Sequence, residues 1–144
     1  MESIILIIII GLAGGVAVGI QSPMASMISQ RLGIFESVFI VHVGGALIAL
    51  LPMIFLGSKL SQWRSLPWYT LGAGIFGLIV IGAISYMIPR VGVAASITTV
   101  VAGQLLVGVL LDHFGLLGAS VRSLDVTRAL GLAVVLAGVW LTVK

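Results

Sequence analysis

The sequence predicts an all-α membrane protein, a polytopic helix bundle with five transmembrane helices. Of its 144 residues, 60% are hydrophobic and 8% are charged, whereas about a quarter of the residues in a soluble domain are charged. The mean hydropathy is +1.33. The apolar residues fall into five runs, each close to the roughly twenty residues that a helix needs to cross the hydrocarbon core of a bilayer.

The five runs predict a single transmembrane domain that covers residues 1–144. The expected spans are about residues 3–28, 34–56, 67–88, 91–111 and 126–143. Residues 29–33 and residues 89–90 are expected to form short turns, because glycine and proline disfavour helix continuation there. Five crossings place the two ends of the domain on opposite sides of the membrane, which we call side A for the N-terminal end and side B for the other.

Composition and motifs exclude several classes of function. The chain has no cysteine, so disulfide and thiol chemistry are excluded. A net charge of +3, dispersed along the chain, does not predict nucleic-acid binding. We find no Ser/His/Asp arrangement, no metal-ligand cluster and no phosphate-binding loop, and His42 and His113 are expected at opposite depths. The sequence therefore predicts no enzymatic activity, no metal and no cofactor.

Uncharged polar side chains are expected to gather in one half of the bundle. Following each span from its side of entry places eight of them in the B half or near the middle, with Ser85 and Thr98 among them. Six of the eight are the candidates for substrate binding: Gln21, His42, Tyr86, Ser96, Thr99 and Gln104. Such a group predicts a substrate-binding cavity that opens to side B. The alternatives are structural, because a membrane serine or threonine commonly donates to a helix carbonyl. His42 and Gln21 could likewise bond to the backbone or to a neighbouring helix.

A second polar group is expected at the A end of the fourth span. Gln104, Gly108 and Asp112 follow one another at intervals of four residues, so they lie on roughly one helix face. Asp112 and His113 could form a gate by pairing with Arg122 or Arg128. In the other interpretation they are a solvated border pair. Arg90 marks the border on side B.

Glycines predict where helices approach one another closely. Gly11, Gly15 and Gly19 form one stripe on the first span, and the fourth span carries Gly103 and Gly108. Small residues at such spacing allow close backbone contact between helices in lipid.

The cations are almost evenly divided between the two sides of the membrane. Four are expected on side A and three on side B: Lys59, Arg64, Arg122 and Arg128 against Arg31, Arg90 and Lys144. Loop cations usually favour the cytoplasmic side and set the orientation. A near tie is typical of a protein that inserts in both orientations, although so few charges also make a small sample.

Several short motifs resemble the small, five-span YdcZ-type proteins of the drug/metabolite transporter superfamily, over nearly the whole chain. They are Gln21 followed by Leu32-Gly33, Leu66-Pro67-Trp68, Pro89 with Val91-Gly92, Gly103-Gln104 followed by Asp112-His113-Phe114-Gly115, and finally Arg128, Gly131 and Gly138. One departure concerns the first span, where relatives often carry asparagine four residues after the glutamine. Ala25 stands at that position here, with Ser26 next.

The resemblance implies a small-molecule transporter of the bacterial inner membrane, with the fold of one half of a small multidrug exporter. Such a half implies an antiparallel, dual-topology homodimer, or a pair with a homologous chain, that works by alternating access. Small multidrug exporters couple protons through a glutamate in the first span, and Gln21 is the nearest analogue here. Because an amide does not titrate, a neutral or zwitterionic metabolite fits better than a lipophilic cation.

Two other functions are compatible with the residues. A membrane assembly or lipid-interacting protein without transport would explain the glycine content and the lack of titratable groups in the expected core. A passive channel formed by the same dimer is the third hypothesis, and a saturating electrical leak would favour it.

Overall fold

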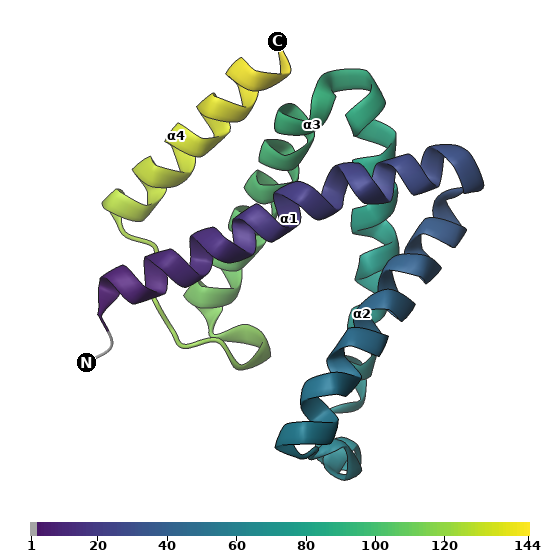
Figure 1. Cartoon of the computed structure of the whole chain (residues 1–144). Coiled ribbons are helices and arrows are strands. Elements are labelled where there is room, and N and C mark those ends of the chain that lie inside the picture. Colours follow the sequence, from purple (N-terminus) through teal and green to yellow (C-terminus); the bar gives the residue numbers. More distant parts are fainter. Residues whose placement is uncertain (1–2) are drawn as a thin grey trace. The chain divides into compact units, whose positions relative to one another are not determined.

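The computed structural model describes residues 3–144, and α-helices make up most of that length (Figure 1). The α-helices are α1 (Ile4–Leu32), α2 (Ile34–Leu56), α3 (Ala73–Phe114) and α4 (Val126–Val143). Short 3-10 helices occupy the connections: η1 (Leu60–Ser65), η2 (Trp68–Gly72) and η3 (Leu116–Gly118). No strand occurs in residues 3–144, so the predicted all-α fold is confirmed. The first two residues of the predicted domain lie outside the described residues.

Four helical stretches of the described chain are long and apolar enough to cross a membrane: Ile4–Leu32, Ile34–Leu56, Trp68–Phe114 and Val126–Val143. The third stretch contains Gly92, whose φ of 83° and ψ of 171° are not helical. At about 1.5 Å per residue, the α3 segments before and after Gly92 are about 28 and 33 Å long, so each can cross the hydrocarbon core. The residues from 3 to 144 therefore make the five crossings of a polytopic membrane bundle.

Two turns lie at slightly different positions from those predicted. Helix α1 continues through residues 29–32 and ends at Gly33, whose φ is 119°. Helix α3 likewise continues through residues 89–90, and the break comes at Gly92. In both places the chain turns at a positive φ, which costs glycine little and other residues considerably more. The predicted turn at residues 89–90 is therefore wrong by two residues, because the glycine and not the proline makes the break.

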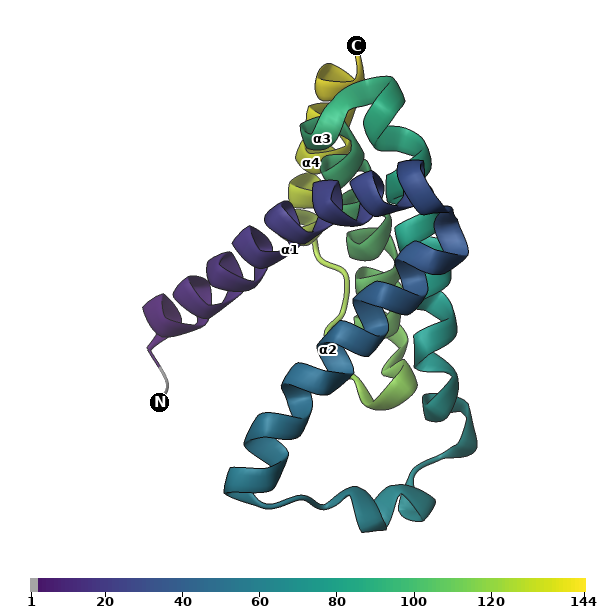
Figure 2. The same cartoon turned by 45° about the vertical axis from the view of Figure 1, so that its right-hand side comes forward.

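The contacts divide the chain into two compact units, residues 1–86 and 87–144. In the first unit, α1 and α2 meet at Gly33 and diverge from it like the arms of a V (Figures 1 and 2). The hydroxyl of Ser37 at the start of α2 donates to the carbonyl of Ala25 at 2.8 Å and ties the two arms together. The prediction that residues 1–144 form one transmembrane domain stays a prediction.

The first segment of α3 runs antiparallel to α2 within the first unit. Gly82 lies beside Ile34, near the start of α2, and Gly77 lies beside His42, about two turns further along α2. The connection between α2 and α3 contains η1 and η2. In η1, Arg64 lies over the Trp63 ring at 5.4 Å. Amphipathic aromatic rings of this kind are typical of the boundary between lipid and water.

In the second unit, α4 runs antiparallel to the second segment of α3. The hydroxyls of Thr98 and Thr142 share a hydrogen bond of 3.1 Å near one end of the pair. Arg128 and Asp112 form an ion pair near the other end. Asp125 caps α4 by accepting from the backbone N–H of Arg128 at 2.7 Å, which satisfies one of the unpaired donors at the helix start.

Small side chains are buried and large apolar side chains are exposed. The buried residues include Ala25, Ser26, Ser37 and Ser96, each at most 3% exposed. Phe55 is 82% exposed, and most of the large apolar side chains along the helices are exposed as well. This distribution suits lipid as the solvent, because small residues let helix backbones approach while apolar side chains meet acyl chains.

We expect Ser37→Ala to lower the free energy of unfolding by about 1 kcal/mol, because the substitution removes a hydrogen bond between α1 and α2. Ser22→Ala is the matched control: Ser22 is also buried, but its hydroxyl only donates to the carbonyl of Val18 in the same helix. Unfolding in mixed detergent micelles measures both changes. Equal losses for the two variants would contradict an interhelical role for Ser37.

Candidate functional site

A cleft of about 400 Å³ lies between the arms of the V in the first unit. Ten residues of α1 and α2 line it: Ala17, Ile20, Gln21, Met24, Ala25, Ile28, Ile40, Val41, Gly44 and Gly45. Gln21 carries the one polar side chain among them, and none of the ten is titratable. The cleft therefore offers an apolar surface with a single amide, which can donate and accept hydrogen bonds without carrying charge.

Small residues on the facing helices keep this cleft open. Ala17 and Ala25 belong to the α1 wall, and Gly44 and Gly45 belong to the α2 wall. A Cβ atom at either glycine would meet nothing within 4 Å. The arms are held together near the vertex by Ser37 and Ala25, and the two helices diverge away from Gly33 (Figure 2). The V itself thus creates the space that Gln21 faces.

His42 does not line this cleft but lies in the contact between α2 and α3. Its Nδ1 donates to the carbonyl of Val38 at 2.8 Å. A carbonyl can only accept, so Nδ1 carries a proton, and in the neutral ring Nε2 is an acceptor. A Cβ atom at Gly77 would overlap the Nε2 edge of the His42 ring. The geometry matches the structural alternative for His42, and its predicted role in substrate binding stays a prediction.

Most hydroxyls in the predicted cavity bond to their own helix. Ser96 donates to the carbonyl of Gly92 at 2.6 Å, and Thr99 donates to that of Ala95 at 2.8 Å. Such bonds satisfy the hydroxyl locally, as the alternative interpretation expected. Ser85, which the sequence placed in the B half but not among the binding candidates, is 6% exposed, and its Oγ has no hydrogen-bond partner in the described chain. Nothing in its sequence context distinguishes Ser85 from the serines that bond to their own helix.

Tyr86 and Arg90 lie on either side of the boundary between the two units. The Tyr86 side chain is 61% exposed, and both residues have interaction partners in the structure. Tyr86 belongs to the first unit and Arg90 to the second. Their predicted roles in binding and at the membrane border stay predictions.

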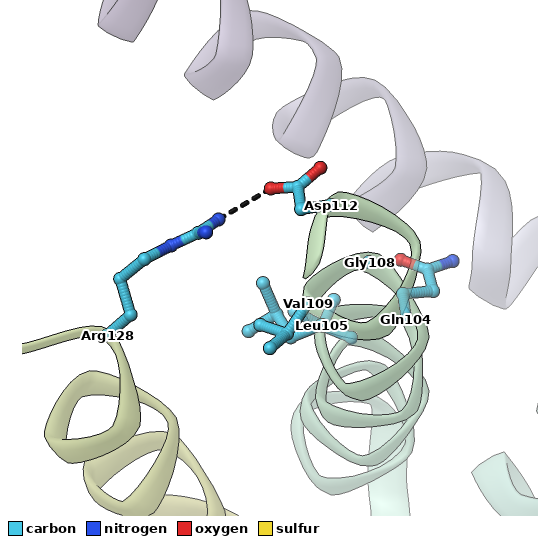
Figure 3. A pocket seen from close by; sticks show the side chains of 7 residues that line it. Gln104, Leu105, Gly108, Val109, Asp112 and Arg128 are labelled. Atoms are coloured by element: carbon cyan, nitrogen blue, oxygen red, sulfur yellow. Dashed lines mark hydrogen bonds and ion pairs between the residues drawn. The ribbon is translucent and has the colours of Figure 1, made fainter. Parts of the chain in front are cut away.

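A second pocket, of about 270 Å³, lies between α3 and α4 in the second unit. It is lined by Val101, Gln104, Leu105, Gly108, Val109, Asp112 and Arg128. Figure 3 shows Leu105 and Val109 directed toward α4, whereas the amide of Gln104 is directed away from it. The predicted row of Gln104, Gly108 and Asp112 does border one pocket, but the Gln104 amide does not point toward the ion pair.

Asp112 pairs with one of the two arginines named as its candidate partners. Its carboxylate accepts from Arg128 at 2.5 Å, and both side chains are about one third exposed, at 34% and 31% (Figure 3). The second η nitrogen of Arg128 donates to the carbonyl of Arg122 at 2.9 Å. Arg128 therefore joins the end of α3 to the loop that precedes α4. Whether this pair opens and closes as a gate stays a prediction.

The glycines predicted to pack helices have open space around them. A Cβ atom built at Gly11, Gly15, Gly19, Gly103 or Gly108 would meet nothing within 4 Å. These positions therefore make no close helix contact within their own unit. Their predicted packing role stays a prediction.

A family model described as "Putative inner membrane exporter, YdcZ" matches residues 6–141 of the chain. The match covers nearly the whole chain, so the protein belongs to the YdcZ family of inner membrane exporters, as its motifs predicted. Together with the membrane-length helices, membership makes it a multi-pass inner membrane protein of a transporter family and not of an enzyme family. No curated protein and no solved structure matches the chain.

We expect Gly77→Ala to destabilise the protein by about 1–3 kcal/mol, because the added methyl group overlaps the His42 ring in a packed contact. Gly74→Ala is the control, since a Cβ atom there meets nothing within 4 Å and alanine favours the helix. Thermal unfolding in detergent compares the two. The double variant Gly77→Ala/His42→Ala should regain most of the lost stability, because the overlapping ring is gone. A double variant as unstable as Gly77→Ala would show that overlap with His42 is not the cause.

Proposed function

We propose that the protein is a half-transporter that moves a small neutral or zwitterionic molecule by alternating access, as an antiparallel, dual-topology dimer. The observation that carries the proposal is the cleft between α1 and α2, which has an apolar lining, one amide and no titratable group. Membership of an exporter family supports the general class of function. The antiparallel dimer, the alternating-access mechanism and the substrate class go beyond what family membership gives.

The open side of the cleft supports a second copy as part of the working unit. Ile20 and Met24 on α1 and Ile40 on α2 line the cleft and are 59%, 58% and 42% exposed in one chain. A binding site in a membrane must separate its ligand from lipid, because polar groups are costly in hydrocarbon. Two inverted copies facing each other would enclose the cleft and bring two Gln21 amides to it. Inverted-repeat transporters place their sites at such an interface, near the midplane.

The depth of Gln21 agrees with such an interface. Helix α1 has 29 residues, so its midpoint falls at Val18, and Gln21 lies about 4.5 Å beyond it. Side chains on a helix tilt toward the N-terminus, which brings the amide back toward the midpoint. A two-fold axis in the membrane plane would therefore bring the two amides to similar depths. The near tie of loop cations, four against three, supports insertion in both orientations.

The orientation can be measured directly, because the chain has no cysteine. We expect Ser3→Cys and Lys144→Cys, tested separately in whole cells, each to react with a membrane-impermeant maleimide in about half of the molecules. Permeabilised cells give the total. Labelling of only one end would rule out the homodimer, and the chain would then need an oppositely oriented homologous partner.

The substrate class can be tested with tetraphenylphosphonium as the lipophilic cation and a panel of uncharged amino acids. We expect no pH-dependent flux of the cation between pH 6 and 8 in proteoliposomes, because no titratable group lines the cleft. A transported amino acid should show flux that saturates and is stimulated by the same amino acid on the far side. Gln21→Leu should abolish that flux, and Gln21→Asn should restore part of it.

Three outcomes would contradict this function. A titratable flux of tetraphenylphosphonium would overturn the neutral substrate class. A conductance without stimulation from the far side would favour the passive channel over alternating access. A protein that neither binds nor moves any solute but retains specific lipids would favour the lipid-interacting alternative.

A further inference from the structure

The loop between α3 and α4, residues 115–125, is an ordered segment with an unusual backbone. Gly115, Leu117 and Gly118 all have positive φ angles, of 63°, 54° and 83°. Leu117 is the one residue other than glycine with a positive φ in the described chain. A left-handed conformation is unfavourable for leucine and persists only when surrounding contacts impose it. The contacts that hold this loop therefore decide whether it keeps its shape.

Two neighbouring residues at the end of α3 hold the loop. The carbonyl of Asp112 accepts from the backbone N–H of Arg122 at 2.8 Å. The imidazole of His113 accepts at Nδ1 from the backbone N–H of Leu124 at 3.2 Å. Arg128 adds its own bond to the carbonyl of Arg122. Of these acceptors, only the imidazole can lose its accepting capacity at mild pH.

The bond to His113 requires one protonation state of the ring. A backbone N–H can only donate, so Nδ1 must present its lone pair, and the proton of the neutral ring lies on Nε2. A second proton would convert Nδ1 into a donor that faces the Leu124 donor, and the bond would be lost. Histidine changes its charge between about pH 5 and 8. His113 is exposed, so protons from the water on side A reach it.

We propose that His113 is a protonation-sensitive latch: the neutral ring holds the last part of the loop, residues 123–124, on the end of α3 through Leu124, and protonation releases this part while Arg122 stays bound. The charged groups of this end are Asp112 on α3, Arg122 and Asp125 in the loop, and Arg128 on α4. Asp112 is paired with Arg128, and Asp125 accepts from the N-terminus of α4. These contacts do not depend on the imidazole, so they keep α3 and α4 together while the latch opens.

An antiparallel dimer would give the latch a direction, and this part alone rests on the proposed function. The two copies of His113 would face opposite compartments. A pH gradient across the membrane would then protonate one latch and leave the other neutral. The acidic side would carry the released loop and the other side the closed loop. The gradient would thus make the two halves of the dimer unequal without any titratable group in the α1–α2 cleft.

A spin label at Ser123→Cys in the full, otherwise cysteine-free chain reports the motion of this part of the loop, because Ser123 is exposed and lies between the contacts of Arg122 and Leu124. We expect the ratio of mobile to immobile label to rise about fivefold or more from pH 8 to pH 5. This factor is the change in equilibrium expected when one hydrogen bond is lost. The change should follow a single titration. The same spectrum at pH 8 and pH 5 would overturn the latch.

Three variants separate the latch from other causes. His113→Asn keeps an amide oxygen that accepts at every pH, so the label should stay immobile at pH 5. His113→Ala has no acceptor and should be mobile already at pH 8. His42→Asn changes the other of the two histidines and should leave the titration unchanged. A titration that survives in His113→Asn, or disappears in His42→Asn, would assign the proton to another group and overturn the proposal.

These spectra need neither a substrate nor a dimer, so a failed transport test does not affect them. The directional part is tested in proteoliposomes with pH 8 inside and pH 5 outside. About half of the labels should then give the spectrum of pH 5, and this fraction should not change when the gradient is reversed. A fraction that switches between nearly all and nearly none would reject the antiparallel dimer and keep the latch.

Discussion

A polar group in the hydrocarbon core can be satisfied only by the protein itself or by a molecule bound to it, because no water is available there. Most polar side chains of the described helices obey this constraint in the simplest way. Ser22, Ser96 and Thr99 bond to a carbonyl one turn earlier in their own helix, and Ser37 bonds across to α1. The exceptions are therefore informative. Gln21 faces an open cleft, and Ser85 is buried with no hydrogen-bond partner in the described residues.

The same constraint explains why large apolar side chains are exposed and small residues are buried, which is the reverse of a soluble protein. The hydrophobic effect does not drive helices together in lipid, so the contacts depend on small residues and on a few interhelical hydrogen bonds. The Ser37–Ala25 bond, the His42–Gly77 contact and the Thr98–Thr142 bond are contacts of this kind. Large apolar side chains cover the outside and serve as the surface toward acyl chains.

The fold class could be predicted because length and hydropathy alone define membrane helices. The break in α3 was harder to place, since proline and glycine both disfavour helix and only the backbone angles show that Gly92 turns the chain. The partner of Asp112 could be narrowed to Arg122 or Arg128 from the sequence, and the ion pair with Arg128 decides between them. The family could be identified from motifs spread over the whole chain, and the family comparison confirms it.

The candidate site could be predicted only in part. Depth along each helix was available from the sequence, but the direction of a side chain around the helix was not. Gln104 thus borders a pocket while its amide points away from α4, and His42 lies against α3. The small residues that shape the α1–α2 cleft, such as Ala17 and Gly45, carry no chemical signal, because their contribution is the space that they leave. The bond from Leu124 to His113 depends on a loop shape that no periodicity predicts.

The odd number of crossings has an evolutionary consequence. The N-terminal end of α1 and the C-terminal end of α4 lie on opposite sides of the membrane, because the break at Gly92 gives α3 two crossings. If residues 3–144 were repeated in tandem, the second copy would enter the membrane from the side where the first copy ends. A single fusion would therefore create two repeats of opposite orientation without any added helix. A chain with an even number of crossings would have to gain or lose a helix to reach the same architecture.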